Sequence, residues 1–302
     1  MYKVTVTVPA TTTTLGPGLG VLGLALALHT TIEMQVRADE RLHISVLGES
    51  RDMFPTTLDN PVLRAAMRVF QHFEIAPAGL QVDILSQIPW HVGLGAHPAA
   101  ILGGILAANN LVNGNLTNDQ ILDMAFSLGA SYENTTSAMR GGLSISSRID
   151  PHHVAHRSVD TVPLRVVIVA PEVPNYPTRL ENLAAYTLIP DEISHIGQTA
   201  LLIEALRAGD YRLMKQVMKN HVHQTARTAH IPGYAAAVEA AQAAGASAVV
   251  LAGTGPAVLA IAESHHTQIA EVMVGAFQEA GLEAQQWIIG VDRQGVTISV
   301  VE

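Results

Sequence analysis

The chain has 302 residues, 48% of them hydrophobic, which is enough for a sizeable core in one large or two medium domains. Its net charge of −9 argues against a nucleic-acid partner, which would require a basic face. It contains no cysteine, so disulfides, thiolate nucleophiles and cysteine-ligated zinc are excluded. The first residues alternate as in a strand and the most apolar stretch is too short to span a bilayer, so we expect a cytoplasmic protein.

The first half of the chain combines alternating segments with helical ones. Alternation of apolar and polar residues predicts strands at residues 3–8, 32–36, 42–47 and 80–84. Apolar residues at helical spacing predict helices at residues 60–73, 98–110 and 117–128. Asn60 is a candidate N-cap of the first helix, because Pro61 follows it and suits the first helical position.

A polar stretch separates these elements from the second half, and we place a domain boundary there. The predicted domains are residues 1–160 and 161–302. Strands are expected at residues 164–170, 248–251, 257–261, 286–291 and 296–301. Helices are expected at residues 192–208, 210–220, 233–243 and 266–280. Because strands and helices do not alternate regularly, an α+β fold is predicted.

Three segments are unusually rich in glycine. They are residues 9–20 (PATTTTLGPGLG), 88–100 (IPWHVGLGAHPAA) and 251–259 (LAGTGPAVL). Glycine lets the backbone approach a ligand closely, and a loop that leads into a helix presents free N–H groups to an anion such as phosphate. The second segment is therefore a candidate phosphate loop. Taken alone, it is better explained as a glycine turn before a buried helix.

The order and spacing of these segments resemble the signature motifs of the GHMP small-molecule kinases, and within them the homoserine kinase branch. Two further stretches resemble that branch, residues 133–142 (ENTTSAMRGG) and 223–234 (HQTARTAHIPGY). The resemblance implies a GHMP kinase fold, with a ribosomal-S5-like N-terminal domain and a ferredoxin-like C-terminal domain. It also implies ATP-dependent phosphoryl transfer to the hydroxyl of homoserine, a step of threonine biosynthesis, with Mg2+ as a cofactor and a homodimer as the assembly.

The resemblance assigns roles to individual residues. Arg227 and Thr14 are expected to bind the substrate. Arg227 is expected to bind the carboxylate of the substrate, because the guanidinium fork suits a carboxylate. Glu133 and Asn134 are expected at the catalytic centre, near the amino end of the acceptor. Asp123 is a candidate Mg2+ ligand, because this ion prefers one or two carboxylates together with phosphate oxygens. The expected ATP-binding residues are Gly93, Leu94, Gly95, Ala96, His97, Ala99, Gly253 and Gly255.

Several polar residues of the family pattern are replaced in this chain. The replacements are Thr14 for Asn, Gly20 for Asp, Ala96-His97 for Ser-Ser, Ser131 for His, Glu133 for Asp, Ala252 for Ser and Ala257 for Thr. Phosphoryl transfer depends on positioning and charge neutralisation, so these changes bear directly on activity. Two hypotheses stay open: a kinase with a rearranged polar shell, or a non-catalytic homologue that binds a nucleotide or amino acid and regulates another protein. His97 is either a donor to phosphate or a residue that caps or blocks the helix start.

Overall fold

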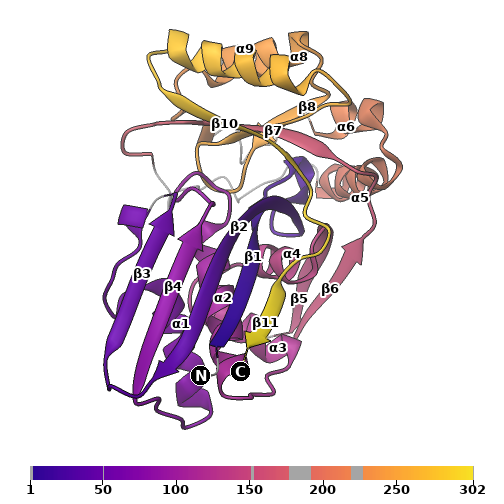
Figure 1. The fold of residues 1–302 in the computed structure, drawn as a ribbon. Coiled ribbons are helices and arrows are strands. Elements are labelled where there is room, and N and C mark those ends of the chain that lie inside the picture. Colours follow the sequence, from indigo (N-terminus) through magenta and orange to yellow (C-terminus); the bar gives the residue numbers. More distant parts are fainter. Residues whose placement is uncertain (1–2, 50, 151–152, 177–191, 219–226, 302) are drawn as a thin grey trace.

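The computed structural model describes residues 3–49, 51–150, 153–176, 192–218 and 227–301. Two separate β-sheets form the frame of the molecule, a larger one built mainly by the first half of the chain and a smaller one built by the second half (Figure 1). Helices pack on both, so the predicted α+β architecture is confirmed. Within the described residues, no helix is long and apolar enough to cross a membrane.

The larger sheet has seven strands in the order β11-β1-β2-β4-β3, with β5 paired to β2 and β6 to β5. All of its pairs are antiparallel except β3 with β4. The strands are β1 (Lys3–Thr13), β2 (Leu22–Arg37), β3 (Leu42–Gly48), β4 (Gly79–Ser86), β5 (Leu143–Asp150), β6 (His153–Val159) and β11 (Thr297–Val301).

Four helices accompany this sheet: α1 (Pro61–His72), α2 (Ala96–Leu111), α3 (Asn118–Ser127) and α4 (Tyr132–Arg140). The predicted cap of α1 is confirmed, because the side chain of Asn60 accepts a hydrogen bond from Val62 N at 2.9 Å. Helix α2 contacts β1, β2 and the other three helices, and nearly all of its residues are buried. A helix that is apolar on every side is a core helix, and α2 thereby holds its N-terminus in a fixed place.

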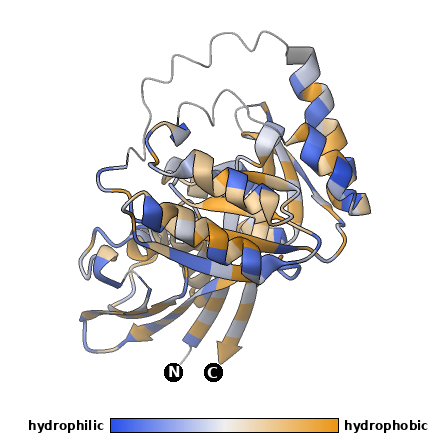
Figure 2. Cartoon of the chain, turned by 90° about the horizontal axis from the view of Figure 1, so that it is seen from above, coloured by the Kyte–Doolittle hydropathy of each residue, from blue (hydrophilic) through white to orange (hydrophobic). Residues whose placement is uncertain are grey.

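The smaller sheet has the order β10-β7-β9-β8, formed by β7 (Arg165–Pro171), β8 (Ala248–Leu251), β9 (Val258–Ile261) and β10 (Ala284–Gly290). Its chain order β7, β8, β9, β10, with helices in the first and last connections, is the ferredoxin-like arrangement. Helices α8 (Tyr234–Ala243) and α9 (His266–Glu279) lie side by side over the sheet (Figures 1 and 2). Helices α5 (Glu192–Ala208) and α6 (Tyr211–Val217) pack against each other beside it.

Two features of the fold differ from the sequence prediction. The polar stretch after residue 148, predicted as a boundary, contributes to the hairpin of β5 and β6. Most residues at the end of β5 and along β6 are exposed, so hydrophobic alternation does not mark these strands in the sequence. The last strand, β11, pairs with β1 in the larger sheet, so the chain returns to its first half after residue 290. The predicted boundary at residue 160 assigns β11 to the second domain, although it pairs with a strand of the first half. The domain boundary stays a prediction.

Candidate active site

A cleft of about 790 Å³ collects the three glycine-rich segments. The first contributes the end of β1 and the turn after it, the second contributes the loop before α2, and the third contributes the loop between β8 and β9. The start of α4, His195 of α5 and Arg227 complete the described lining. Segments far apart in the sequence therefore meet at one place, as the motif pattern predicts.

The second and third segments pack backbone against backbone. Gly93 has φ +97°, and a Cβ at this residue would lie 1.9 Å from the carbonyl oxygen of Ala252. A Cβ at Gly255 would likewise lie 2.2 Å from the carbonyl oxygen of Val92. Ala257 N donates to this same Val92 oxygen at 3.2 Å. These glycines therefore set the shape of the cleft by allowing two loops to touch, a contact that no side chain could accommodate.

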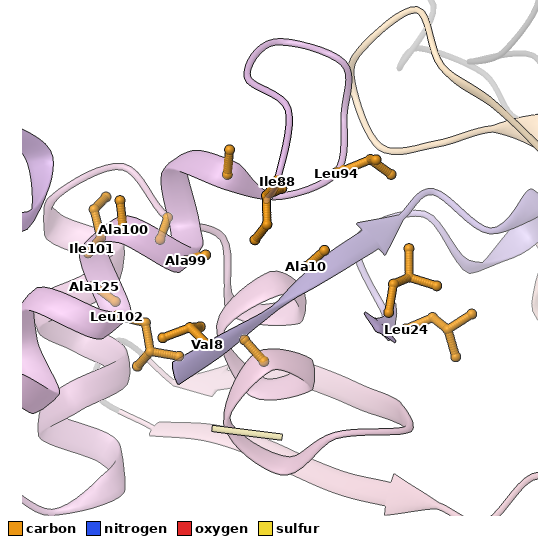
Figure 3. Close-up of a cluster of buried hydrophobic side chains, with 14 of the residues drawn as sticks. Val8, Ala10, Leu24, Ile88, Leu94, Ala99, Ala100, Ile101, Leu102 and Ala125 are labelled. Carbon is orange, nitrogen blue, oxygen red and sulfur yellow. The ribbon is translucent and has the colours of Figure 1, made fainter. Parts of the chain in front are cut away.

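The loop before α2 is anchored at its base in the hydrophobic core. Ile88 and Leu94 are buried, and Figure 3 shows Leu94 over Ala10 of β1, with Ile88 beside the first turn of α2. Gly95 is the N-cap of the helix, in a left-handed conformation with φ +72°, and no side chain caps the helix. Its first N–H groups are thus available, and together with the helix dipole they favour an anion in the cleft.

Thr14 connects the first segment with the third. It is buried, and its hydroxyl donates to the carbonyl oxygen of Gly253 at 2.9 Å, while Gly253 N donates to the carbonyl oxygen of Thr13 at 3.1 Å. The hydroxyl proton of Thr14 is therefore used inside the protein. Thr14 lines the cleft and holds the third segment, and its contact with a substrate stays a prediction.

Asn134, at the start of α4, is held by two neighbours. Its Oδ1 accepts from the Thr11 hydroxyl at 2.7 Å, and its Nδ2 donates to the Ser131 hydroxyl at 2.8 Å. Ser131 is the N-cap of α4. Because one end of the Asn134 amide accepts a hydrogen bond and the other end donates one, the two contacts fix the orientation of the amide. One Nδ2 hydrogen of Asn134 stays available to a ligand. Glu133, one residue earlier, also lines the cleft.

Arg227 enters the cleft from the second half of the chain. It is 8% exposed, its NH1 donates to the carbonyl oxygen of Thr254 at 3.2 Å, and its buried Nε has no hydrogen-bond partner among the described residues. Burial raises the pKa of Tyr176, and the charge of the nearby Arg227 opposes that rise. A buried guanidinium with an unused donor is costly unless a ligand completes its hydrogen bonds.

Aromatic and histidine side chains form the wall beside the start of α2. The Trp90 ring lies edge-on to Phe54 at 4.5 Å and to His97 at 5.9 Å, measured between centroids. Burial lowers the pKa of His97 below its usual value, a hydrogen bond with the Leu128 backbone opposes this, and the charges of Arg64 and His91 lower it further. These influences together favour the neutral ring of His97.

Most of the predicted site residues lie together in this lining. They are Thr14, Gly93, Leu94, Gly95, Ala96, His97, Glu133, Asn134, Arg227 and Gly253. Three predicted residues lie outside it: Ala99 is buried in the core (Figure 3), Gly255 packs against the second segment, and Asp123 is on α3. No group of three or more His, Asp or Glu in the described parts of the chain is placed to hold a metal ion.

Trp90, His91, His195 and Thr254 are among the lining residues that were not predicted as site residues. Trp90 and His91 lie inside the second glycine-rich segment, so their position between Pro89 and Gly93 is the signal that could have found them. Thr254 lies between two glycines of the third segment in the same way. His195 lies in α5, and no local pattern distinguishes it.

Comparisons with known proteins agree with this geometry. Residues 60–142 match the family model of the GHMP kinases N terminal domain, and residues 202–278 match that of the GHMP kinases C terminal. The chain is 32% identical to the homoserine kinase of Nostoc punctiforme, which it covers over 97% of both chains. It is 34% identical to the homoserine kinase of Moorella thermoacetica, over 92% of this chain and 94% of the relative.

Solved structures show the same fold. The crystal structure of homoserine kinase from Cytophaga hutchinsonii superposes with a TM-score of 0.84 at 21% identity, over 98% of this chain and 97% of the other. The structure of L. major mevalonate kinase in complex with R-mevalonate gives a TM-score of 0.72 at 16% identity, over 95% of each chain. The fold is that of the GHMP kinases. Within this class, the chain belongs to the homoserine kinase family.

Proposed function

We propose that this protein is a homoserine kinase, which transfers the γ-phosphoryl group of ATP to the side-chain hydroxyl of homoserine. The observation that carries the proposal is the meeting of the uncapped start of α2 with the buried, incompletely bonded Arg227 in one cleft. The first suits a phosphate group and the second suits a carboxylate. ATP and an amino acid together present both groups.

In this proposal each wall of the cleft takes one substrate. The loop of residues 93–96 and the first turn of α2 receive the ATP phosphates, because no side chain caps the first N–H groups of the helix. Arg227 binds the carboxylate of the amino acid through its unused donors. Glu133 faces the ammonium group, and Asn134, held by Thr11 and Ser131, offers its remaining N–H to the acceptor.

Mg2+ would enter this site with the nucleotide, where it neutralises phosphate charge in the transition state. Glu133 is the only carboxylate among the described lining residues, and hydroxyls of Thr13 and Ser131 are nearby hard oxygen groups. This donor set fits an ion that takes most of its ligands from phosphate and water. The role of Asp123 as a metal ligand stays a prediction, and its place outside the lining does not favour it. The homodimer and the cytoplasmic location also stay predictions.

Calorimetry with the full chain tests the proposal. ATP with Mg2+ is titrated alone and then in the presence of homoserine, and the release of ADP is followed in parallel. We expect nucleotide binding that tightens with homoserine, and ADP release that requires it. Binding of both ligands without ADP release would support the non-catalytic hypothesis instead. A folded sample that binds neither ligand would reject the proposal.

A further inference from the structure

The wall that would receive the ATP phosphates has few fixed positive charges. Among the described residues that line the cleft, Arg227 is the only permanently charged cation, and there is no lysine. Glu133 offsets that one charge. Three histidines, His91, His97 and His195, line the same cleft. A nucleotide triphosphate carries several negative charges, so its neutralisation has to come from elsewhere.

We propose that His97 takes up a proton from solvent when the nucleotide triphosphate binds, and that the resulting imidazolium pairs with a phosphate group. This inference rests on the proposed function, since it concerns the same nucleotide site. Its chemistry is a single protonation: the lone pair of one ring nitrogen accepts a proton that the buffer supplies, and no other bond forms or breaks.

The position of His97 supports this role. It is the second residue of α2, directly beside the uncapped N–H groups, and its ring reaches across to the turn after α3. Its Nε2 lies 3.8 Å from the place where a Cβ would stand at Gly129, which also lines the cleft. A hydrogen bond with the Leu128 backbone holds the ring there. His97 thus lies between the phosphate loop and the turn after α3.

The tautomer explains why a proton is needed. A backbone carbonyl can only accept, so the ring nitrogen that meets the Leu128 carbonyl carries a hydrogen. In the neutral ring the other nitrogen is then an acceptor, which a phosphate oxygen cannot approach favourably. Protonation turns that nitrogen into a charged donor, and a charge-assisted hydrogen bond to phosphate is stronger than a neutral one.

The groups around His97 decide the direction of the pH dependence. The charged ring of His97 is disfavoured by burial, by Arg64 on α1 and by His91 in the preceding loop. The Leu128 carbonyl at the end of α3 favours the charged ring. Glu133 lies on the α4 side of the cleft. In the free protein the pKa of His97 is therefore below its usual value. Bound phosphate raises it. The gain in affinity is fully present below the free pKa and is lost as pH rises through the bound pKa.

The size of the effect follows from linkage. Each pKa unit by which bound phosphate raises the pKa of His97 strengthens nucleotide binding about tenfold at low pH. Between the two pKa values, binding takes up as much as one proton for each nucleotide. Adenosine has no phosphate, so its binding should take up no proton through His97.

Calorimetry in two buffers of different ionisation enthalpy measures this proton directly. The full chain is titrated with ATP and Mg2+ between pH 6 and 8, and the variants are His97→Gln, His97→Asn and His91→Gln, each checked for folding by circular dichroism. We expect proton uptake in the original chain and in His91→Gln, and a loss of that uptake in both His97 variants. Adenosine is the matched control ligand.

Two results would overturn the inference while leaving the proposed function intact. One is ATP binding whose proton uptake is the same in the original chain and in the His97 variants. The other is uptake that disappears in His91→Gln and persists in His97→Gln. Absence of ATP binding at every pH would reject the nucleotide site itself, and the two failures are therefore distinguishable.

Discussion

Two walls of the cleft are built on different principles. The backbone wall, formed by residues 92–95 and 252–256, gets its shape from loops in direct contact, with glycine where a side chain would collide. The side-chain wall, formed by Glu133, Asn134 and Arg227, gets its shape from hydrogen bonds such as those of Thr11 and Ser131 with Asn134. At Gly93 and Gly255 the backbone wall has no room for a side chain. The side-chain wall tolerates substitutions that preserve the hydrogen bonds of its residues. Substitutions can test that difference.

The largest effect is expected in the backbone wall, from Gly93→Ala. A Cβ would lie 1.9 Å from the Ala252 carbonyl oxygen, and the residue has φ +97°. Forcing the loops apart should lower the free energy of unfolding by about 3 kcal/mol or more, and nucleotide binding should be lost. Urea unfolding and calorimetry measure the two effects.

Gly20→Ala is the matched control for this substitution. Gly20 also has a positive φ, +69°, but a Cβ there meets nothing within 4 Å. Only the conformational cost is expected, about 1 kcal/mol. If the two variants were equally destabilised, close packing would not be the reason for glycine at residue 93.

The next largest effect is expected in the side-chain wall, from Arg227→Lys. The lysine keeps the charge but loses the planar fork, so kcat/KM for homoserine should fall by about 10²–10³, the usual cost of one electrostatic contact. Steady-state kinetics at varied homoserine measures it. Arg207→Ala is the control, because Arg207 is exposed, lies outside the described cleft lining and pairs with Glu204. An unchanged kcat/KM in Arg227→Lys would remove Arg227 from the substrate site.

A smaller effect is expected from Thr11→Val, which keeps the shape of the side chain and removes its hydroxyl. Asn134 would lose the donor to its Oδ1, so we expect about 1 kcal/mol of lost stability and about a tenfold lower kcat. Thr12→Val is the control, since the Thr12 hydroxyl is also buried but does not contact Asn134. Equal kinetics in the two variants would contradict the positioning of Asn134 by Thr11.

The smallest effect lies outside both walls, at the contact of His29 with Asp292, whose side-chain atoms are 2.6 Å apart. Burial raises the pKa of Asp292, but hydrogen bonds from His29, Gly295 and Gln294 together hold it below its usual value. The resulting stability is present above the unfolded pKa and lost as pH falls through the folded pKa. Urea unfolding between pH 5 and pH 3 should therefore show a shallower decline for Asp292→Asn than for the original chain, and parallel curves would contradict this.

The contrast between the walls also explains what the sequence could predict. Gly93, Gly95 and Gly253 lie in continuous motifs, so the resemblance of these motifs to the GHMP kinase pattern made the backbone wall predictable. The partners of the side-chain wall are not local: Thr11 and Asn134 are 123 residues apart, and their hydrogen bond depends on α4 packing against β1. Ala99 shows the same limit, because its place in a motif did not reveal that it faces the core.

Strand β11 is a second example of a non-local feature. Its alternation predicts a strand, but nothing in residues 296–301 indicates that the partner is β1 at the other end of the chain. Closeness to Glu133 in sequence makes Asp123 a candidate metal ligand, and this role stays a prediction. The turn between α3 and α4 leaves Asp123 outside the cleft lining that contains Glu133.

The central claim is phosphoryl transfer to homoserine, and phosphorus NMR of the full chain with ATP, Mg2+ and homoserine tests it most directly. We expect a new phosphomonoester signal that grows in step with ADP and requires homoserine. Bound ATP that yields no phosphomonoester, or that yields only inorganic phosphate whether or not homoserine is present, would contradict the claim.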